Sequence, residues 1–166
     1  MGCGVRFKCS KCGKEYGTHT GIGMGFPRVY KRTIDEVKNG RYGEEWKRLA
    51  LSEDFVAVDA ERYLYICEKC GYWTVDLDLS LYAPNDSETI KKMQYGEKTV
   101  EEWEEVPYVM RWRLEQNYHL LKRRIHKCGK CGDSLRIATS EEEYRLPCPE
   151  CGGAPQKGSI REINWD

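Results

Sequence analysis

Eight of the nine cysteines in this 166-residue chain lie in four Cys-x-x-Cys-Gly sequences, which we call knuckles. The knuckles are Cys9–Gly13, Cys67–Gly71, Cys128–Gly132 and Cys148–Gly152. Four thiolates complete the tetrahedral shell of one metal ion, and two knuckles supply four thiolates. The sequence therefore predicts two metal ions per chain, bound by cysteine alone.

Spacing along the chain predicts which knuckles share an ion. Sixteen residues separate Cys131 from Cys148, which fits the Cys-x2-Cys-x(15–20)-Cys-x2-Cys spacing of zinc sites. The expected second site therefore contains Cys128, Cys131, Cys148 and Cys151. The expected first site contains Cys9, Cys12, Cys67 and Cys70. The long insertion in the first site is acceptable because each doubling of a loop costs only about 0.6 kcal/mol.

Zinc is the expected ion because closed four-cysteine sites are its commonest structural use. Iron is the alternative, since Cys67–Gly71 and Cys148–Gly152 each resemble a rubredoxin knuckle. Those two knuckles are not partners in the expected pairing, which argues against an iron electron carrier. A thioredoxin-type redox role would need a helix that starts at the first cysteine, and the sequence indicates none.

The residues beside the knuckles support a charged metal site. The glycine after each second cysteine accepts a positive φ and lets backbone amides turn toward sulfur. Cations flank the first and third knuckles, where they would stabilise thiolates. They are Arg6, Lys8, Lys11 and Lys14, and then Lys122, Arg123, Arg124, His126, Lys127 and Lys130. Contact with nucleic acid is the alternative role of these cations.

Two further segments could contact a ligand or partner. The glycine-rich loop 17–27 carries His19, Met24 and Phe26, and its amides could form an anion-binding nest, but a structural turn is the favoured explanation. Trp103 lies in the run Glu101–Glu105 and could bind a partner or pack on the body of the protein. No paired carboxylates, nucleophile–base set or open metal position is identifiable, so the sequence leans away from an enzyme.

The elements that position the cysteines follow from hydrophobic periodicity. Alternation predicts strands that lead into the first two knuckles and a strand over 73–81. A capping box at Thr33 and Glu36 predicts a helix, and further helices are expected over 44–51 and 111–122. In the C-terminal part, strands are expected over 135–139, 144–146 and 158–164.

These elements predict a small α+β protein organised by metal, with two zinc ribbons of short antiparallel strands. We expect a ribbon with a helical insertion over 1–84, an acidic helical connector over 85–122 and a C-terminal ribbon over 123–166. Only 40% of the residues are apolar and 33% are charged. Because such a core is modest, metal binding should contribute to folding.

Charge and composition exclude several classes of protein. The 27 basic residues equal the 27 acidic ones, and eight thiolates with two divalent ions bring the net charge to about −4. A nonspecific nucleic-acid binder normally has a basic excess, which this chain lacks, although local basic patches remain possible. No signal peptide and no apolar stretch long enough to cross a membrane is present. Paired cysteines without an export signal indicate metal binding in a reducing cytoplasm.

The Cys-x2-Cys-Gly repeats resemble those of zinc-ribbon (rubredoxin-like) proteins. The wider arrangement is similar to uncharacterised bacterial proteins with two ribbons, through the stretches Gly23–Pro27, Gly43–Trp46, Asp78–Tyr82 and His126–Cys128. The resemblance implies a small cytosolic metal-binding protein and supplies no catalytic residue.

We therefore expect an interaction module that is stabilised by two structural Zn(Cys)4 sites. A protein is the expected partner, and nucleic acid is the alternative. Two other functions compete with this one. The first is an enzyme or accessory subunit that uses loop 17–27, and the second is a redox sensor whose thiolates release zinc on oxidation.

Overall fold

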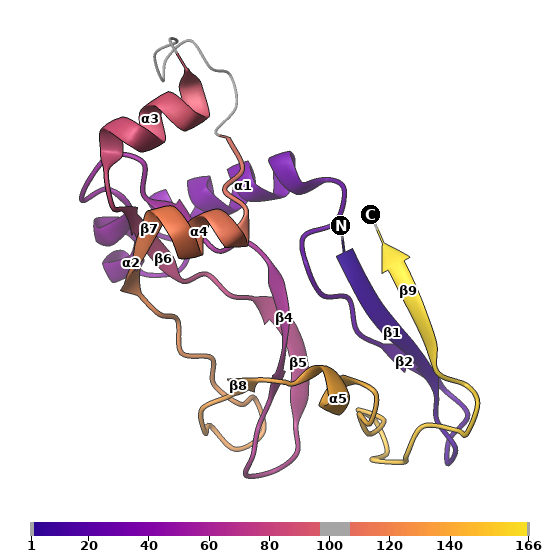
Figure 1. Cartoon of the computed structure of the whole chain (residues 1–166). Helices are drawn as coiled ribbons and strands as arrows, with labels where there is room; N and C mark the ends of the chain where they lie inside the picture. Colours follow the sequence, from indigo (N-terminus) through magenta and orange to yellow (C-terminus); the bar gives the residue numbers. More distant parts are fainter. Residues whose placement is uncertain (1, 97–106, 166) are drawn as a thin grey trace. The chain divides into compact units, whose positions relative to one another are not determined.

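The structure is a computed structural model, and it describes residues 2–96 and 107–165. These residues form five helices and three three-stranded antiparallel sheets, which is compatible with the expected α+β class. They divide into two compact units, and each unit is assembled from separate segments of the chain (Figure 1). Unit 1 comprises Met1–Met24, Glu61–Leu77 and Ile125–Asp166, and unit 2 comprises Gly25–Ala60 and Asp78–Arg124.

The expected division into 1–84, 85–122 and 123–166 does not correspond to these units. Segment 1–84 contributes to both of them, and unit 1 contains the two ends of the chain. The reason is strand pairing, because the first strand bonds to the last strand rather than to its neighbours in sequence. All nine cysteines lie in unit 1.

The first sheet of unit 1 has the order β2-β1-β9. Its strands are β1 (Gly2–Lys8), β2 (Glu15–Gly17) and β9 (Arg161–Trp165). Val5 and Phe7 of β1 are buried while Arg6 and Lys8 are exposed, as the alternation in the sequence predicts. The first knuckle forms the turn between β1 and β2, and Phe7 pairs with Tyr16 across it.

The second sheet of unit 1 repeats this topology in the order β5-β4-β8. Its strands are β4 (Arg62–Ile66), β5 (Trp73–Leu77) and β8 (Arg136–Ile137). The second knuckle forms the turn between β4 and β5. In each sheet the central strand also pairs with a strand that follows a later knuckle. We call the two arrangements ribbon A (β1, β2, β9) and ribbon B (β4, β5, β8).

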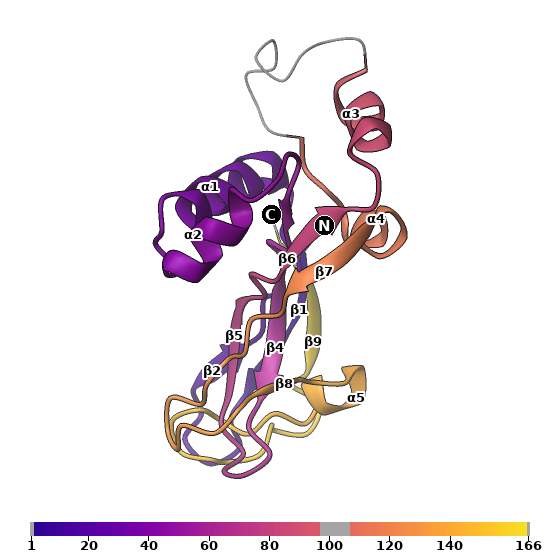
Figure 2. The same cartoon turned by 90° about the vertical axis from the view of Figure 1, so that its left-hand side faces the viewer.

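The two ribbons share one hydrophobic core. Val5 and Phe7 of ribbon A pack with Leu64 of ribbon B and with Leu146. Partly buried side chains from both sheets complete this cluster: Tyr16, Ile66, Trp73, Val75 and Ala138. Both views show the turns after β1 and β4 at the same end of unit 1 (Figures 1 and 2). Packing therefore places the knuckles of both ribbons at one end of the unit.

Helix α5 (Ser140–Glu143) belongs to unit 1 and lies between the third and fourth knuckles. Thr139 and Glu142 form a capping box that fixes its start. The sequence predicts a strand over 144–146, but these residues form no strand. The Leu146 side chain instead packs in the shared core.

Unit 2 contains four helices and the sheet β3-β6-β7. The helices are α1 (Phe26–Lys38), α2 (Glu44–Ala50), α3 (Ser87–Tyr95) and α4 (Arg111–Asn117). The strands are β3 (Ala57–Val58), β6 (Leu81–Pro84) and β7 (Tyr118–Lys122). Tyr30, Ile34 and Val37 follow helical spacing, and all three are buried on one face of α1.

Three predicted elements of unit 2 differ from the structure. Helix α1 begins at Phe26 rather than at Thr33, because Pro27 in the first turn starts it earlier. The Thr33 hydroxyl therefore donates to the carbonyl of Val29 within the helix. The predicted helix 111–122 ends at Asn117 and continues as β7, which pairs with β6. The helix expected over 44–51 is confirmed as α2.

The predicted strand 73–81 is divided at Leu79, which has a φ of 62°. Residues before this point form β5 of unit 1, and those after it form β6 of unit 2. A positive φ is unfavourable for a branched side chain. Here the Leu79 amide donates to Asp59 and its carbonyl accepts from the Trp46 indole, which holds the conformation in place.

Candidate metal centres

The eight knuckle cysteines form two clusters, and in each cluster the four sulfur atoms lie within 4.8 Å of one another. Cluster A contains Cys9, Cys12, Cys148 and Cys151. Cluster B contains Cys67, Cys70, Cys128 and Cys131. Each cluster could hold a metal ion.

The sulfur–sulfur distances fit a tetrahedral ion. They are 3.5 Å between Cys9 and Cys151 and 3.8 Å between Cys12 and Cys148. In cluster B the pairs Cys67–Cys131 and Cys70–Cys128 are both 3.5 Å apart. A regular tetrahedron with metal–sulfur bonds of about 2.3 Å has edges of about 3.8 Å. Both clusters therefore have nearly the dimensions of a closed four-thiolate site.

The pairing of knuckles predicted from spacing is wrong. Cys9 and Cys12 meet Cys148 and Cys151, and Cys67 and Cys70 meet Cys128 and Cys131. The 16-residue segment after Cys131 does not fold back on its own knuckle, because β8 pairs with β4 of ribbon B. After β8 the chain passes through α5, and the fourth knuckle then contacts the first, where the Ser10 amide donates to Ala154.

All four knuckles have the same backbone hydrogen bonds. The amide of each knuckle glycine donates to the carbonyl of the first cysteine, over 2.9–3.1 Å. The amide of each first cysteine donates to the carbonyl five residues later, over 2.7–2.8 Å. The glycines have φ values of 72°, 70°, 73° and 69°. The expectation that each glycine adopts a positive φ is therefore confirmed.

Backbone amides also point at sulfur, as expected. The amides of Lys11 and Cys12 lie 3.4 and 3.5 Å from the Cys9 sulfur. The amide of Lys130 lies 3.4 Å from the Cys128 sulfur. These donors favour the thiolate form of the first cysteine in each of these knuckles.

The pKa values within each cluster diverge. The hydrogen bond from the Cys12 amide is the largest cause that lowers the pKa of Cys9 to about 6. Burial raises the pKa of Cys128, but the amides of Cys131 and Lys130 outweigh it and lower that pKa to about 6. The pKa of Cys131 rises to about 12, although the Asp133 amide lowers it, because burial and the neighbouring sulfurs oppose its ionisation. All four sulfurs of a cluster can therefore be thiolates only when a cation offsets their mutual repulsion.

Burial follows the same pattern in every knuckle. The first cysteine is buried, and the second is exposed, or half-buried in the case of Cys151. The sulfurs of Cys70 and Cys151 belong to different clusters, yet both residues line one hollow of about 300 Å³ in unit 1, together with Tyr72, Trp73 and Lys130. We call this space the inter-cluster hollow.

Ion pairs connect the segments that meet at each cluster. Lys14 beside the first knuckle pairs with Glu150 of the fourth. Arg136 of β8 contacts Glu68 of the second knuckle and Glu142 of α5, both at 2.6 Å. The Arg136 guanidinium is the largest cause that lowers the pKa of Glu142 to about 2. Of the expected basic flanks, Lys122, Arg123 and Arg124 belong to unit 2.

The predicted ligand loop is divided between the two units. His19 lies in unit 1 with its ring 5.9 Å from that of Trp165, and Met24 is exposed. Phe26 begins α1 in unit 2 and contacts the ring of Tyr108. The Gly21 amide donates to the carbonyl of Arg62, so it does not face an open nest. Trp103 lies outside the described residues.

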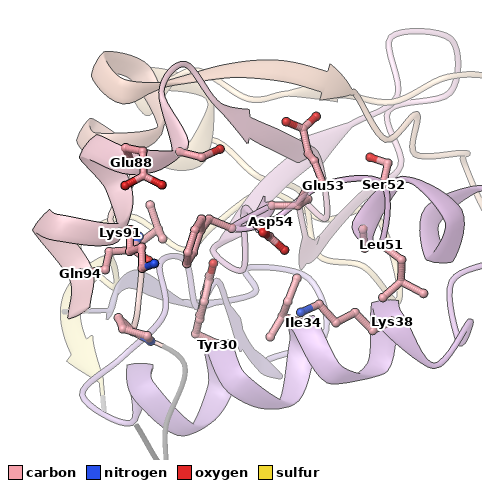
Figure 3. Close-up of a pocket in the computed structure, with 16 residues that line it drawn as sticks. Tyr30, Ile34, Lys38, Leu51, Ser52, Glu53, Asp54, Glu88, Lys91 and Gln94 are labelled. Carbon is pink, nitrogen blue, oxygen red and sulfur yellow. The ribbon is translucent and has the colours of Figure 1, made fainter. Parts of the chain in front are cut away.

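A cavity of about 940 Å³ lies within unit 2 (Figure 3). Its apolar lining includes the buried side chains of Tyr30, Ile34 and Val109, which α1 and the segment before α4 supply. Charged side chains of both signs surround it: Lys38, Glu53, Asp54, Glu88 and Lys91. The cavity thus has an apolar floor and a charged rim. His19, Met24 and Phe26 do not line it, so sequence reasoning missed this cavity.

Within the described part of the chain, no helix has the length and apolar character needed to span a bilayer. The two cysteine clusters fit a zinc-ribbon-like arrangement. Comparison with family models, with curated proteins and with solved structures found no match.

Proposed function

We propose that this protein is a cytoplasmic interaction module whose fold depends on two structural Zn(Cys)4 centres. The observation that carries this proposal is the closed geometry of both clusters. Each provides four sulfurs within 4.8 Å of one another, which fills a tetrahedral shell, whereas catalytic zinc keeps one position for water. The centres therefore stabilise the ribbons and leave binding to the surfaces around them.

Zinc is the proposed ion because both ligand sets are pure thiolate and tetrahedral. Iron is the rival, but the two rubredoxin-like knuckles, at Cys67 and Cys148, lie in different clusters. Elemental analysis of protein purified under reducing conditions tests the proposal, with two zinc ions per chain as the expected result. One ion per chain, or the visible absorption of ferric thiolate, would contradict it.

Exposed apolar side chains support a protein partner. Met110 and Trp112 at the start of α4 and Leu120 on β7 are each more than two-fifths exposed, all within unit 2. β7 is an edge strand of its sheet, and such strands offer unpaired backbone groups to a partner. Nucleic acid is the second class of partner, which the exposed arginines of ribbon A support.

A binding test separates these partners from a purely structural role. The metal-loaded protein is immobilised, and proteins that it retains are identified and then tested again as purified components. We expect retention that Trp112→Ala weakens, while Met93→Ala, which removes another exposed apolar side chain of unit 2, serves as the control. If no purified protein or nucleic acid binds, the interaction role fails although the metal assignment stands.

Redox sensing is the second candidate, favoured by the exposure of the second cysteine in most knuckles. A hydroperoxide that enters the inter-cluster hollow reaches residues of both clusters. Two thiolates would each lose one electron and form a disulfide, while hydrogen peroxide takes up two protons and leaves as two waters. Metal release at micromolar peroxide, reversed by reductant and metal, would support this role. The Cys3→Ser variant removes the remaining thiol as a control.

A further inference from the structure

Two arginines lie directly opposite each other on ribbon A. In the antiparallel register of β1 and β9, Arg6 pairs with Arg161. Directly opposed residues have Cβ atoms about 5 Å apart, and like charges at that distance destabilise a sheet. Both side chains are exposed. Within the described residues, neither guanidinium has an ion-pair or hydrogen-bond partner.

The same face of the sheet carries a third cation. Lys8 lies two residues beyond Arg6 and is exposed, so it points to the same side as Arg6. Glu15 is opposite Lys8 and is the one carboxylate at the paired positions of this face in the described chain. The other face of β1 carries Val5 and Phe7 of the core. The outward face is therefore locally basic although the whole chain is neutral.

An aromatic side chain lies on the same face, four residues from Arg161 along β9, and the Arg62 guanidinium lies 5.8 Å from the centre of its ring. Trp165 pairs with Gly2 across the same face of β1 and β9, and a Cβ at Gly2 would meet its ring at 2.3 Å. The indole nitrogen donates to the carbonyls of Cys3 and Thr20, over 3.1 and 3.0 Å, which fixes the ring. The rings of His19 and Trp165 are 5.9 Å apart, and His19 is exposed. Planar groups and cations thus share one face of the sheet.

We propose that the outward face of the β2-β1-β9 sheet binds single-stranded nucleic acid. Arg6, Arg161 and Lys8 contact phosphates, and the exposed His19 ring, which packs edge-on against Trp165, stacks against a base. This inference rests on the proposed interaction function and names its nucleic-acid surface. Binding relieves the repulsion between the two guanidiniums, because a phosphate placed between them accepts hydrogen bonds from both.

The aromatic side chains favour nucleic acid over an acidic peptide. Nonspecific binding of single strands combines cations that contact the backbone with aromatic rings that stack on bases. Carboxylates of an acidic peptide would use the arginines but offer no planar group to stack on the exposed His19 ring. With about three phosphate contacts the affinity is modest and depends strongly on salt.

Fluorescence anisotropy with a labelled (dT)20 strand tests the proposal on the full, metal-loaded chain. Three phosphate contacts give a slope of log K against log salt of about −2, so affinity falls roughly 20-fold between 50 and 200 mM salt. The variant Arg6→Gln/Arg161→Gln retains one contact, and its affinity should fall only about threefold over that range. Its affinity at 50 mM should also be clearly lower than that of the unmodified protein.

The matched control is Arg28→Gln/Arg48→Gln, which removes the same charge from exposed positions of unit 2. It should keep the affinity and salt slope of the unmodified protein. Equal losses in both variants would overturn the proposal, because they would indicate a general charge effect. Equal binding of polyglutamate and (dT)20 would also overturn it and would assign the face to acidic peptides.

Metal content and circular dichroism distinguish misfolding from lost binding in each variant. If the unmodified protein carries two ions but does not bind (dT)20, the surface assignment fails. In that case the interaction module with a protein partner survives. Absence of the two ions, by contrast, would defeat the proposed function itself.

Discussion

Ribbons A and B have the same topology, but very different stretches of chain close them. Cys12 and Cys148 of cluster A are 136 residues apart in sequence, whereas Cys70 and Cys128 of cluster B are 58 apart. Loop-closure entropy makes the longer separation about 0.7 kcal/mol more costly. That difference is small beside the strand pairing and metal binding that both ribbons gain, so distance along the chain does not decide the pairing.

The chain segment closed by cluster B lies within the segment closed by cluster A, which further reduces the difference between their loop-closure costs. The segment between Cys12 and Cys148 contains all four cysteines of cluster B. Once ribbon B has formed, Cys70 and Cys128 are adjacent, and the chain that ribbon A must close is effectively shorter. We therefore expect ribbon B to form before ribbon A.

Metal removal should break both ribbons and produce the largest effect. Structural zinc contributes on the order of 10 kcal/mol per site in small domains. All cysteines lie in unit 1, so EDTA with reductant should unfold unit 1 while the helical signal of unit 2 remains. Amide hydrogen exchange measures the two units separately. Slow exchange of the β1 and β4 amides after complete chelation would contradict the role of metal in folding.

Double cysteine variants test the nested pairing itself. Cys67→Ser/Cys131→Ser removes two ligands from cluster B alone, so the protein should retain one ion per chain. Cys12→Ser/Cys67→Ser damages both clusters, and both ions should bind weakly. The pairing expected from spacing gives the reverse result, because it places Cys12 with Cys67 and separates Cys67 from Cys131. Elemental analysis after dialysis distinguishes the two outcomes.

The shared core predicts that damage to one ribbon reaches the other. Leu64 of ribbon B is buried and belongs to the same cluster as Val5 and Phe7 of ribbon A. Leu64→Ala should cost about 2–5 kcal/mol of unfolding free energy. Hydrogen exchange of β1 should accelerate together with that of β4. Protection lost in β4 alone would mean that the ribbons are energetically independent.

Equivalent glycines allow a direct comparison of the two ribbons. Gly13 and Gly71 have φ values of 72° and 70°, and an added Cβ would have nothing within 4 Å at either position. Alanine should therefore cost only the backbone strain of about 1–2 kcal/mol, equally in both ribbons. Chemical denaturation of the metal-loaded variants gives these costs. Unequal values would show that the two knuckles differ in more than their position in the chain.

The smallest expected effect concerns pH and belongs to ribbon B. Arg136 lowers the pKa of Glu142 from 4.5 to about 2. The stabilisation from this pair is thus fully present above pH 4.5 and is lost as pH falls toward 2. Carbon NMR should show Glu142 still ionised at pH 4, and Arg136→Gln should raise its pKa toward 4.5. A Glu142 pKa near 4.5 in the unmodified protein would show that Arg136 does not stabilise the Glu142 carboxylate.

Local sequence accounts for much of the candidate site. The Cys-x-x-Cys-Gly pattern predicts each turn, because only glycine adopts the required positive φ without strain. The alternation in β1 and the apolar positions of α2 are also predictable from the sequence, because each depends on neighbours within a few residues. The split of the predicted strand 73–81 is not readable, because contacts of Leu79 with Asp59 and Trp46 hold that residue in its conformation.

One feature of the sequence, other than spacing, indicates which knuckles share a metal ion. The first two knuckles are each flanked by alternating residues on both sides, as in Val5–Tyr16 and Leu64–Val75, which is the pattern of a hairpin. The third and fourth knuckles lack it. Each cluster in the structure joins one hairpin knuckle to one knuckle without a hairpin. That rule excludes the expected pairing but still leaves two pairings open.

The sequence by itself determined the ligands, their number and the shape of each knuckle, because those properties depend on side-chain chemistry and on five consecutive residues. Only the tertiary structure decided which knuckles meet, which segments form each unit and that Arg6 faces Arg161. These outcomes depend on hydrogen bonds between β1 and β9 and between β4 and β8, and on one core shared by both ribbons. Interactions between residues so distant in the chain leave no local pattern from which they could be predicted.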